Sequence, residues 1–447
     1  MLLGIFRKMS RMQTIAVGFF VIIMIGTIML MMPFSSRSGE CTSFLTCLFT
    51  SASATCVTGL SVVDTFSHWS FIGQLILLIL IQVGGLGFVT FGVGVSLLLN
   101  RRIRLKQRGL IRESVNVMEI GGVVRLVKMI LKGTIFIEGA GALLLAIRFV
   151  PQMGWGKGIW YGIFHSISAF CNAGFDLMGY RQPSSSFTFY QEDAYVLVIL
   201  MALIIVGSIG FFVWADLKKN KWHWKRYTLH TKMVLSISAV LILAGAVLFF
   251  ILESNGLYQG FSLPDKICNA LFSAVTPRTA GFNAVSNSGL CDASKMLTTV
   301  LMFIGGSPGS TAGGVKTTTV FVLLLHLRAT YTRSGGCNIF GRRIEKDDIQ
   351  KAAAVVVTNL TASLAISFII CAIQNLDIGD LMFEVVSAIS TVGMSAGLTG
   401  ELSAVSQILI IALMYIGRVG SLSFGLSFTD KKKLSHTKQP AEKITIG

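Results

Sequence analysis

The sequence is poor in charged residues. Only 13% of its 447 residues are Asp, Glu, Lys or Arg, about half of the roughly 25% that is typical of a soluble domain. No polar stretch is long enough to fold as a large aqueous domain, so a soluble enzyme with a single anchor is excluded as well. With 53% hydrophobic residues and a mean hydropathy of +0.71, the chain is a membrane protein.

Catalytic and metal-binding patterns are also missing from the sequence. No Ser/His/Asp, paired-carboxylate or metal-ligand spacing appears, so we expect neither an enzyme nor an organic cofactor. Cys41, Cys47, Cys268 and Cys291 are expected outside the membrane, where a disulfide is possible but not required. A proton-coupled carrier would need buried carboxylates at the midplane of the membrane. Only Glu138 qualifies, which argues against such a carrier.

Basic residues are plentiful and clustered. The net charge of +17 would suggest nucleic-acid binding in a soluble protein, but here the cations can be assigned to one side of a membrane. Most of the acidic residues lie between the basic clusters. The positive-inside rule therefore predicts a multi-pass cell-membrane protein with both termini cytoplasmic and no nucleic-acid partner. The clusters are Arg7 to Arg11, Arg101 to Lys128, Lys218 to Lys232, Arg328 to Lys351, and the residues after Asp430.

The apolar sequence between successive basic clusters follows one plan, repeated four times. Each unit has a helix of about 20 residues, a shorter semi-polar segment that ends at a glycine, and a second long helix. The glycines Gly59, Gly174, Gly281 and Gly393 are 115, 107 and 112 residues apart. In every copy an apolar residue lies ten positions before the glycine and another directly follows it. Four ordinary loop glycines would not be expected to share this register.

The semi-polar segments are too short to cross a hydrocarbon core of about 30 Å, so they are expected to be re-entrant half-helices. Non-helical backbone at membrane depth survives only where it is buried in protein or lines water. Four such loops satisfy this condition together if they converge on one axis. The result would be a ring of backbone carbonyls, which favours a cation and is how potassium filters work.

These motifs resemble the Trk/Ktr/HKT superfamily of potassium transporters over nearly the whole chain, and the Ktr-type membrane subunit most. The resemblance is carried by Ser53-Ala-Thr-Cys-Val-Thr-Gly59-Leu, Ala169-Phe-Cys-Asn-Ala-Gly174-Phe, Thr276-Pro-Arg-Thr-Ala-Gly281-Phe-Asn, Thr391-Val-Gly393-Met, Gly305-Gly-Ser-Pro-Gly-Ser-Thr-Ala-Gly-Gly-Val-Lys316 and Gly417-Arg-Val-Gly420. It implies a potassium uptake pore with a pseudo-fourfold arrangement of helix, re-entrant loop and helix, eight spans in all. It also implies a homodimer and a cytosolic nucleotide-binding ring as regulator.

The expected organisation divides the chain into repeats and cytoplasmic segments. The repeats cover 1–100, 128–216, 230–327 and 351–428, and the third has a broken second helix. The cytoplasmic segments are 101–127, 217–229, 328–350 and the tail 429–447. The loops either dock the ring or only set topology and touch anionic lipid.

The resemblance implies two sets of site residues. The ion-binding filter would be Val57, Thr58, Gly59, Asn172, Ala173, Gly174, Thr279, Ala280, Gly281, Thr391, Val392 and Gly393. The glycine-rich run breaks the third unit's second helix and would form the gate, made of Gly305, Gly306, Ser307, Gly309, Ser310, Thr311, Gly313, Gly314 and Lys316, together with Arg418. A phosphate-loop interpretation of this run is rejected, because its spacing and surroundings do not match.

The charged residues near these motifs have alternative interpretations. Arg418 would add a barrier to cations at the gate or extend to the cytoplasmic surface. Lys316 closes the gate loop and would either add to this barrier or begin the next half-helix at the interface. Glu138 and Arg278 are expected to hold structure, although direct ion handling by Glu138 is left open. Asp64 and Asp176 would concentrate cations at the mouth or be solvated loop charges.

Ion preference is inferred from the filter glycines. In the plant branch of the family, serine in place of the first filter glycine is associated with sodium. Gly59 therefore favours potassium, with a sodium-conducting or sodium-coupled relative as the alternative.

Overall fold

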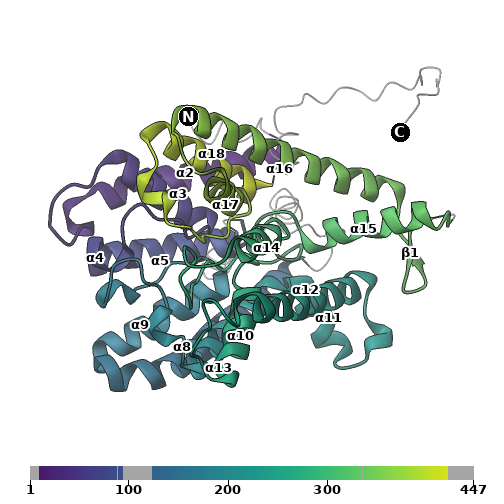
Figure 1. Cartoon of the computed structure of the whole chain (residues 1–447), viewed down its shortest axis with the longest axis horizontal. Helices are drawn as coiled ribbons and strands as arrows, with labels where there is room; N and C mark the ends of the chain where they lie inside the picture. The colour runs from purple at the N-terminus through teal and green to yellow at the C-terminus, as the bar shows by residue number, and fades with distance from the viewer. Residues whose placement is uncertain (1–9, 88, 94–122, 335, 421–447) are drawn as a thin grey trace.

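The computed structural model describes residues 10–87, 89–93, 123–334 and 336–420. The expected cytoplasmic tail 429–447 and residues 101–122 of the first cytoplasmic loop lie outside the described residues, as do Arg7 and Lys8. In the described part, nearly all regular structure is helical (Figure 1).

Four helices are long and apolar enough to cross a membrane: α2 (Arg11–Met31), α8 (Val123–Met153), α12 (Leu229–Glu253) and α16 (Lys346–Ile373). Their apolar side chains face outward as well as inward. Phe136 on α8 and Phe368 on α16 are 76% and 75% exposed. Such exposure is unfavourable in water and expected against lipid, so the structure agrees with a multi-pass membrane protein.

A shorter helix follows each long one. These short helices are α3 (Phe44–Cys56), α9 (Trp155–Cys171), α13 (Leu263–Val275) and α17 (Ile378–Ile389). Ser43, Ser262 and Asp377 cap α3, α13 and α17 by accepting backbone N–H groups. With 12 to 17 residues, none of the four reaches the roughly 20 residues that a span requires.

The helices that complete the four units are shorter than the sequence predicts, or are broken. They are α5 (Phe71–Leu86), α10 (Ala194–Ser208) with α11 (Phe211–Asn220), α14 (Asp292–Phe303) with α15 (Thr317–Tyr331), and α18 (Ala404–Val419). The break in the third unit is present. A second break, unexpected from the sequence, bends α10 and α11 by 92°. Gly210, with φ of +95°, lies at this bend and provides a conformation that other residues rarely adopt.

By length and composition, four helices of the described chain can cross a membrane, or five if the bent pair counts as one span. The remaining elements are small. They are α4 (Thr65–His68), the 3-10 turns η1 (Pro33–Ser35), η2 (Met178–Tyr180), η3 (Thr188–Tyr190), η4 (Trp224–Arg226) and η5 (Leu398–Glu401), and the antiparallel strands β1 (Asn338–Ile339) and β2 (Arg342–Arg343).

Several helices continue into segments assigned to cytoplasmic loops. Helix α8 begins at Val123, α11 ends at Asn220, and α15 ends at Tyr331. Charged residues are compatible with a helix once it leaves the hydrocarbon core, so hydropathy alone makes these helices too short. Figure 1 shows α15, the β1–β2 hairpin and α16 extending from the bundle at its right-hand side.

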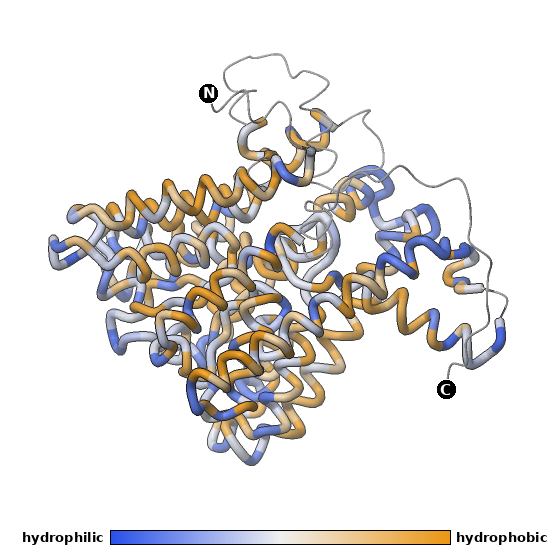
Figure 2. The backbone as a smooth tube through the Cα atoms, turned by 90° about the horizontal axis from the view of Figure 1, so that it is seen from above, coloured by the Kyte–Doolittle hydropathy of each residue, from blue (hydrophilic) through white to orange (hydrophobic). Residues whose placement is uncertain are grey.

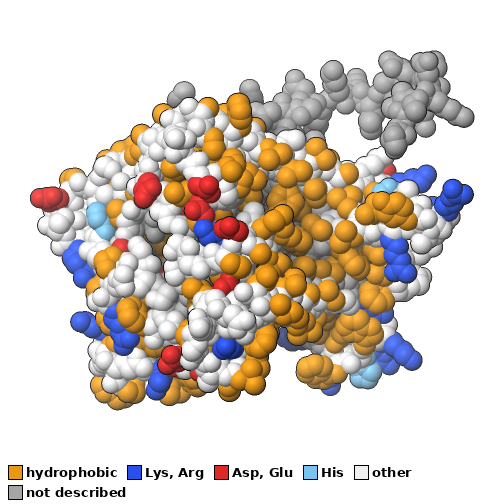
Figure 3. Space-filling model, in the orientation of Figure 1, with side chains coloured by type: hydrophobic (Ala, Val, Ile, Leu, Met, Phe, Trp, Pro, Cys, Tyr) orange, Lys and Arg blue, Asp and Glu red, His pale blue; other side chains and the backbone are white. Residues whose placement is uncertain are grey.

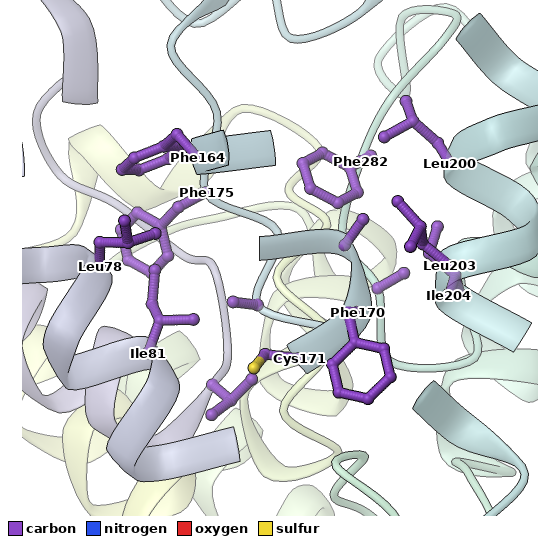
Figure 4. Packing of buried hydrophobic residues seen from close by; sticks show 14 of the residues in the cluster. Leu78, Ile81, Phe164, Phe170, Cys171, Phe175, Leu200, Leu203, Ile204 and Phe282 are labelled. Atoms are coloured by element: carbon purple, nitrogen blue, oxygen red, sulfur yellow. The ribbon is translucent and has the colours of Figure 1, made fainter. Parts of the chain in front are cut away.

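Neighbouring units share buried cores. Figure 4 shows Leu78 and Ile81 of α5, Phe170 and Cys171 of α9, and Leu203 of α10 in one packed cluster. A second cluster joins α3 with α17 and α18, through apolar residues that include Phe49, Ile389 and Met414. The first unit therefore packs against both the second and the fourth, which are far apart in sequence.

Candidate functional site

The four loops that follow the short helices share an unusual backbone. Two residues before each glycine, the chain has positive φ at a residue other than glycine, which is uncommon in proteins. These residues are Val57 (58°), Asn172 (58°), Thr279 (76°) and Thr391 (51°). The glycines themselves also have positive φ, at Gly59 (98°), Gly174 (69°), Gly281 (79°) and Gly393 (92°).

The four glycines form a closed ring. A Cβ built on each glycine would lie no more than 2.9 Å from a carbonyl oxygen of the next unit along the chain, and the fourth unit returns to the first. The pairs are Gly59 with Ala173, Gly174 with Ala280, Gly281 with Val392, and Gly393 with Thr58. Any side chain at these positions would push into neighbouring backbone, so the ring requires glycine for space as well as for φ.

A cavity of about 710 Å³ opens on one side of this ring. All four glycines line it, together with residues that follow them, such as Phe175, Asn283 and Ser395. Asp64 and Asp176 also line it, which leaves both carboxylates beside the approach to the ring. A short helix directs its partly negative C-terminal end toward each loop, and this field favours a cation at the ring.

Hydroxyl groups hold the loops in place. Two of them accept hydrogen bonds from the N–H of a ring glycine: Ser53 from Gly59 and Ser387 from Gly393, both at 3.0 Å. Two others donate to the carbonyl that follows the glycine: Ser168 to Phe175 and Thr276 to Phe282, both at 2.6 Å. Sequence reasoning missed these residues. The available signal was a serine six positions before the glycine in three units and a threonine one position later in the other.

The glycine-rich segment between α14 and α15 lies on the other side of the ring. It folds back on itself through a bond from the Gly305 N–H to the Val315 carbonyl at 2.9 Å. The Thr311 hydroxyl bonds the Phe170 and Gly207 carbonyls at 3.1 Å. Its hydrogen bonds and close glycine contacts with the loops and short helices are to residues that precede the ring glycines, such as Phe170, Thr279 and Thr391. The cavity is lined by the glycines and by residues after them, so the segment and the cavity are on opposite sides of the ring.

Two glycines of this segment pack directly against the fourth unit. A Cβ on Gly313 would collide with the Thr391 side chain, and one on Gly314 would lie 3.1 Å from Ser390. A Cβ on Gly305 would lie 3.3 Å from the Thr279 methyl group. The segment thus touches the third and fourth loops at the positions with the unusual backbone.

Arg418 links this segment to the first unit. Its guanidinium group donates to the Thr311 carbonyl and to the carbonyls of Gly84 and Gly85, the last at 3.1 Å. All three acceptors are backbone carbonyls, and Arg418 itself is half-buried. Lys316 donates to the Ala312 carbonyl at 2.7 Å and also precedes α15 as its N-cap residue. It therefore lies at the end of the segment, directly before the next helix.

A second set of glycines lies where the second helices end, and of these only Gly417 was singled out from the sequence. A Cβ on Gly84, Gly207 or Gly417 would collide with the carbonyl four residues before the corresponding ring glycine, at Thr55, Phe170 or Ile389. Each belongs to a Gly-x-x-Gly pattern that was visible in the sequence, at 84–87, 207–210 and 417–420. These contacts set how closely each second helix approaches its short helix.

The other charged candidates have structural partners. Glu138 is 7% exposed and accepts a bond from Gln82 at 3.1 Å, which joins α8 to α5. Arg278 is 2% exposed and donates to Ser238 at 3.1 Å, and it does not line the cavity. Cys41, Cys47, Cys268 and Cys291 form no disulfide in the described chain.

The two carboxylates of the cavity are both held by backbone groups. Asp64 accepts N–H groups of Ser67 and Ser184, and Asp176 accepts that of Met178 at 2.9 Å. Burial raises the pKa of Asp176 to about 6, and the charge of nearby Asp64 adds to the rise. Asp176 therefore changes charge near physiological pH, at the entrance to the ring.

Comparisons with known proteins support a transport protein rather than an enzyme. The chain is 39% identical to the potassium/sodium uptake protein NtpJ of Enterococcus hirae, over 99% of this chain and 98% of that protein. It is 41% identical to the Ktr system potassium uptake protein B of Bacillus subtilis, over 97% and 96%. The crystal structure of the potassium transporter TrkH from Vibrio parahaemolyticus matches with a TM-score of 0.72 at 18% identity, covering 95% of this chain and 86% of that one.

The family model described as TrkH, cation transport protein, matches residues 5–436. The resemblance inferred from the motifs is thereby confirmed. The chain belongs to the TrkH family of cation transport proteins.

Proposed function

We propose that the chain is the membrane subunit of a Ktr-type potassium uptake system, in which ions are selected by backbone carbonyls. The observation that carries this proposal is the closed ring of Gly59, Gly174, Gly281 and Gly393 at the base of one cavity. A ring of carbonyls can replace the hydration shell of an ion, while the bilayer elsewhere excludes it.

The proposed architecture is a pseudo-fourfold pore with eight crossings. Each repeat would contribute its long helix and its second, often broken, helix, with the short helix re-entering between them. The repeats would be 1–100, 128–216, 230–327 and 351–428, joined by the cytoplasmic segments 101–127, 217–229 and 328–350 and followed by the tail 429–447. The repeated backbone of the four loops supports this division.

The proposed filter consists of each ring glycine and the two residues before it: Val57, Thr58, Gly59, Asn172, Ala173, Gly174, Thr279, Ala280, Gly281, Thr391, Val392 and Gly393. The side chains differ among the repeats, so equivalence resides in the backbone. Unlike the filter of a symmetric tetramer, this one would present four different side-chain surroundings to an ion.

The proposed gate is the segment on the opposite side of the ring from the cavity: Gly305, Gly306, Ser307, Gly309, Ser310, Thr311, Gly313, Gly314 and Lys316, with Arg418. Its position below the loops supports the assignment. Arg418 would hold the segment closed and repel cations at the same depth.

The proposed ion is potassium, moved inward by the membrane potential. Glycine at position 59 and the uptake functions named for the relatives support this choice. The name of the first relative includes sodium, so sodium conduction or coupling is the alternative to test. A proton-coupled carrier has less support, because Glu138 is engaged with Gln82 and Cys171 and does not line the cavity.

The proposed assembly is a homodimer of this chain bound to a cytosolic nucleotide-binding ring, with both termini cytoplasmic. The basic segments would face the nucleotide-binding ring, and salt would weaken such a contact. Co-purification with a candidate ring at low and high ionic strength tests it, with Lys431, Lys432 and Lys433 neutralised in a parallel sample. Equal recovery in every condition would leave the tail as a topology signal.

The deciding experiment for the proposed function is ion flux into liposomes that contain the purified chain, with and without a cytosolic nucleotide-binding ring. We expect uptake of potassium or rubidium in preference to sodium, and stronger uptake with an inside-negative potential. A sodium flux equal to the potassium flux would favour the alternative, and electroneutral exchange with protons would contradict a pore.

A further inference from the structure

A second cavity, of about 540 Å³, lies far from the glycine ring, between the α11–α12 loop and the β1–β2 hairpin. Four cations line it: Lys225 and Arg226 of the loop, Lys232 of α12, and Arg342 of the hairpin. Among the described residues that line this basic cavity, none is acidic. The residues of the cavity thus combine a strong positive field with enclosed space.

These cations are not neutralised by carboxylates elsewhere in the described chain. Its ion pairs are Arg148 with Asp193, Lys295 with Asp380 and Lys351 with Asp348, and none involves the basic cavity. Glu345 follows Arg342 by three residues but forms no ion pair with a cation of the cavity in the described chain, and Asp216 accepts hydrogen bonds from Asn220 and Thr228. Lys232 bonds only the Lys225 carbonyl, at 3.2 Å, which does not cancel its charge.

The position of the cavity is that of a membrane interface. It adjoins Leu229, the first residue of α12, which is long and apolar enough to span a membrane. The positive end of this helix therefore points at the cavity and adds to the field. Figure 2 shows hydrophilic backbone gathered at the end of the molecule that carries the α11–α12 loop and the hairpin.

Exposed aromatic side chains surround the same site. Trp222 is 96% exposed, and Trp224 and Phe340 are 44% and 45% exposed. The rings of Trp224 and Phe340 meet edge to face, with centroids 6.4 Å apart, so they connect the loop to the hairpin. Figure 3 shows apolar side chains next to Lys and Arg at this end of the molecule. Exposed tryptophan beside lysine and arginine is typical of the boundary between lipid headgroups and acyl chains.

We propose that the basic cavity binds the phosphate of an anionic phospholipid headgroup. The four cations would hold the phosphate, while Trp222, Trp224 and Phe340 would sit among the headgroups and upper acyl chains. A soluble phosphate compound shares the same charge chemistry, but it has no use for exposed tryptophan. The inference does not depend on which ion passes the ring. It concerns a surface separate from the glycine ring, so its failure would leave the proposed pore standing, whereas docking of the nucleotide-binding ring at the same basic segments is one of the outcomes tested below.

The test uses the full chain in mixed micelles of neutral detergent, titrated with dibrominated phosphatidylglycerol, whose bromine atoms quench nearby tryptophan. The signal is the part of the quenching that disappears in the variant W222F/W224F. We expect saturable quenching by this lipid and little by dibrominated phosphatidylcholine. The triple variant K225Q/R226Q/R342Q should bind more weakly by about fivefold for each cation removed.

A matched variant, K218Q/K219Q/R328Q, removes three exposed cations that do not line the cavity. It should keep the lipid affinity of the original chain. Both variants should elute as the original does on size exclusion and retain cation flux, which shows that they are folded.

Four outcomes would overturn the inference. One is equal quenching by the zwitterionic lipid, and another is equal weakening in the two triple variants. The third is displacement of the lipid by inorganic phosphate at matching concentration, which would indicate a soluble ligand. In the fourth, K225Q/R226Q/R342Q loses a candidate nucleotide-binding ring but binds lipid as before, which would make the surface a protein-docking site.

Discussion

Arg418 donates a hydrogen bond to the carbonyl of Thr311, which lies 107 residues earlier in the chain. The same guanidinium group reaches the Gly84 and Gly85 carbonyls at the end of α5. One side chain thereby connects the first, third and fourth units at the level of the glycine-rich segment. Three carbonyl acceptors around one guanidinium group make this a strong contact, because a charged donor roughly doubles the strength of a hydrogen bond.

We expect R418A to raise ion flux and make it less dependent on a cytosolic partner. Removing even one hydrogen bond to a charged group costs roughly 1.5 to 3 kcal/mol, enough to shift a closed segment toward open by about tenfold or more. Flux in proteoliposomes measures this. R418K keeps the charge but loses the forked geometry, so its flux should lie between those of R418A and the original chain. Lower or unchanged flux in a folded R418A protein would contradict a gating role for Arg418 and the glycine-rich segment.

Shortening the segment between Gly305 and Gly314 should act in the same direction. This part of the chain packs against Thr391 and Ser390 beneath the ring, so deleting part of it opens the space there. We expect higher flux with less effect on ion preference, since the glycine ring remains. The ratio of rubidium to sodium uptake separates the two effects, and a changed ratio at unchanged flux would argue that the segment shapes the filter instead.

We expect G59S to weaken the preference for potassium. Gly59 has a φ of +98°, and a Cβ there would lie 2.6 Å from the Ala173 carbonyl oxygen, so the loop must shift. Rubidium and sodium uptake would be compared in cells that lack other potassium uptake systems. G39S is the control, because Gly39 also has positive φ, at +75°, but has open space around it. An unchanged ratio of rubidium to sodium uptake, at a normal amount of protein, would contradict the assignment of this loop to the filter.

Loss of the serine hydroxyls behind the ring should also affect selectivity. S53A leaves the Gly59 N–H without its acceptor, which costs roughly 1 to 3 kcal/mol and loosens the loop. We expect reduced discrimination between rubidium and sodium and a lower melting temperature. T50V is the matched control, because the buried Thr50 hydroxyl bonds only the Thr46 carbonyl of its own helix. Equal discrimination in S53A and T50V would contradict a role for Ser53 in shaping the ring.

Uptake should depend on pH through Asp176. Its pKa is raised from 3.8 to about 6, so the carboxylate is charged at pH 7 and largely neutral at pH 5. At low cation concentration we expect uptake by the original chain to fall as pH falls through 6. Uptake by D176N should be lower than that of the original chain at pH 7 and should not change with pH in this range. A raised pKa in the folded state also means that the protein loses stability as pH rises through about 4 to 6. Uptake by D176N that keeps the original pH dependence would assign the effect to another group.

The sequence alone determined the membrane class and the family, and it predicted a fourfold repeat. These features rest on composition or on sequence motifs, and none of them depends on knowing which distant residues are in contact. The residues of the proposed filter and gate could be named because the family resemblance identifies both motifs, and the repeats mark the equivalent filter positions.

The tertiary structure decided which equivalent residues touch. That Gly59 lies against Ala173, Gly393 against Thr58, and Arg418 against Thr311 depends on close packing between segments more than 100 residues apart. The 92° bend between α10 and α11 was decided in the same way. Its local signal, Gly207-x-x-Gly210, also occurs at 84–87 and 417–420, so the motif by itself does not give the angle of the bend. Hydropathy reports how a residue prefers to be solvated, whereas these features depend on which backbone atoms approach within a few ångströms.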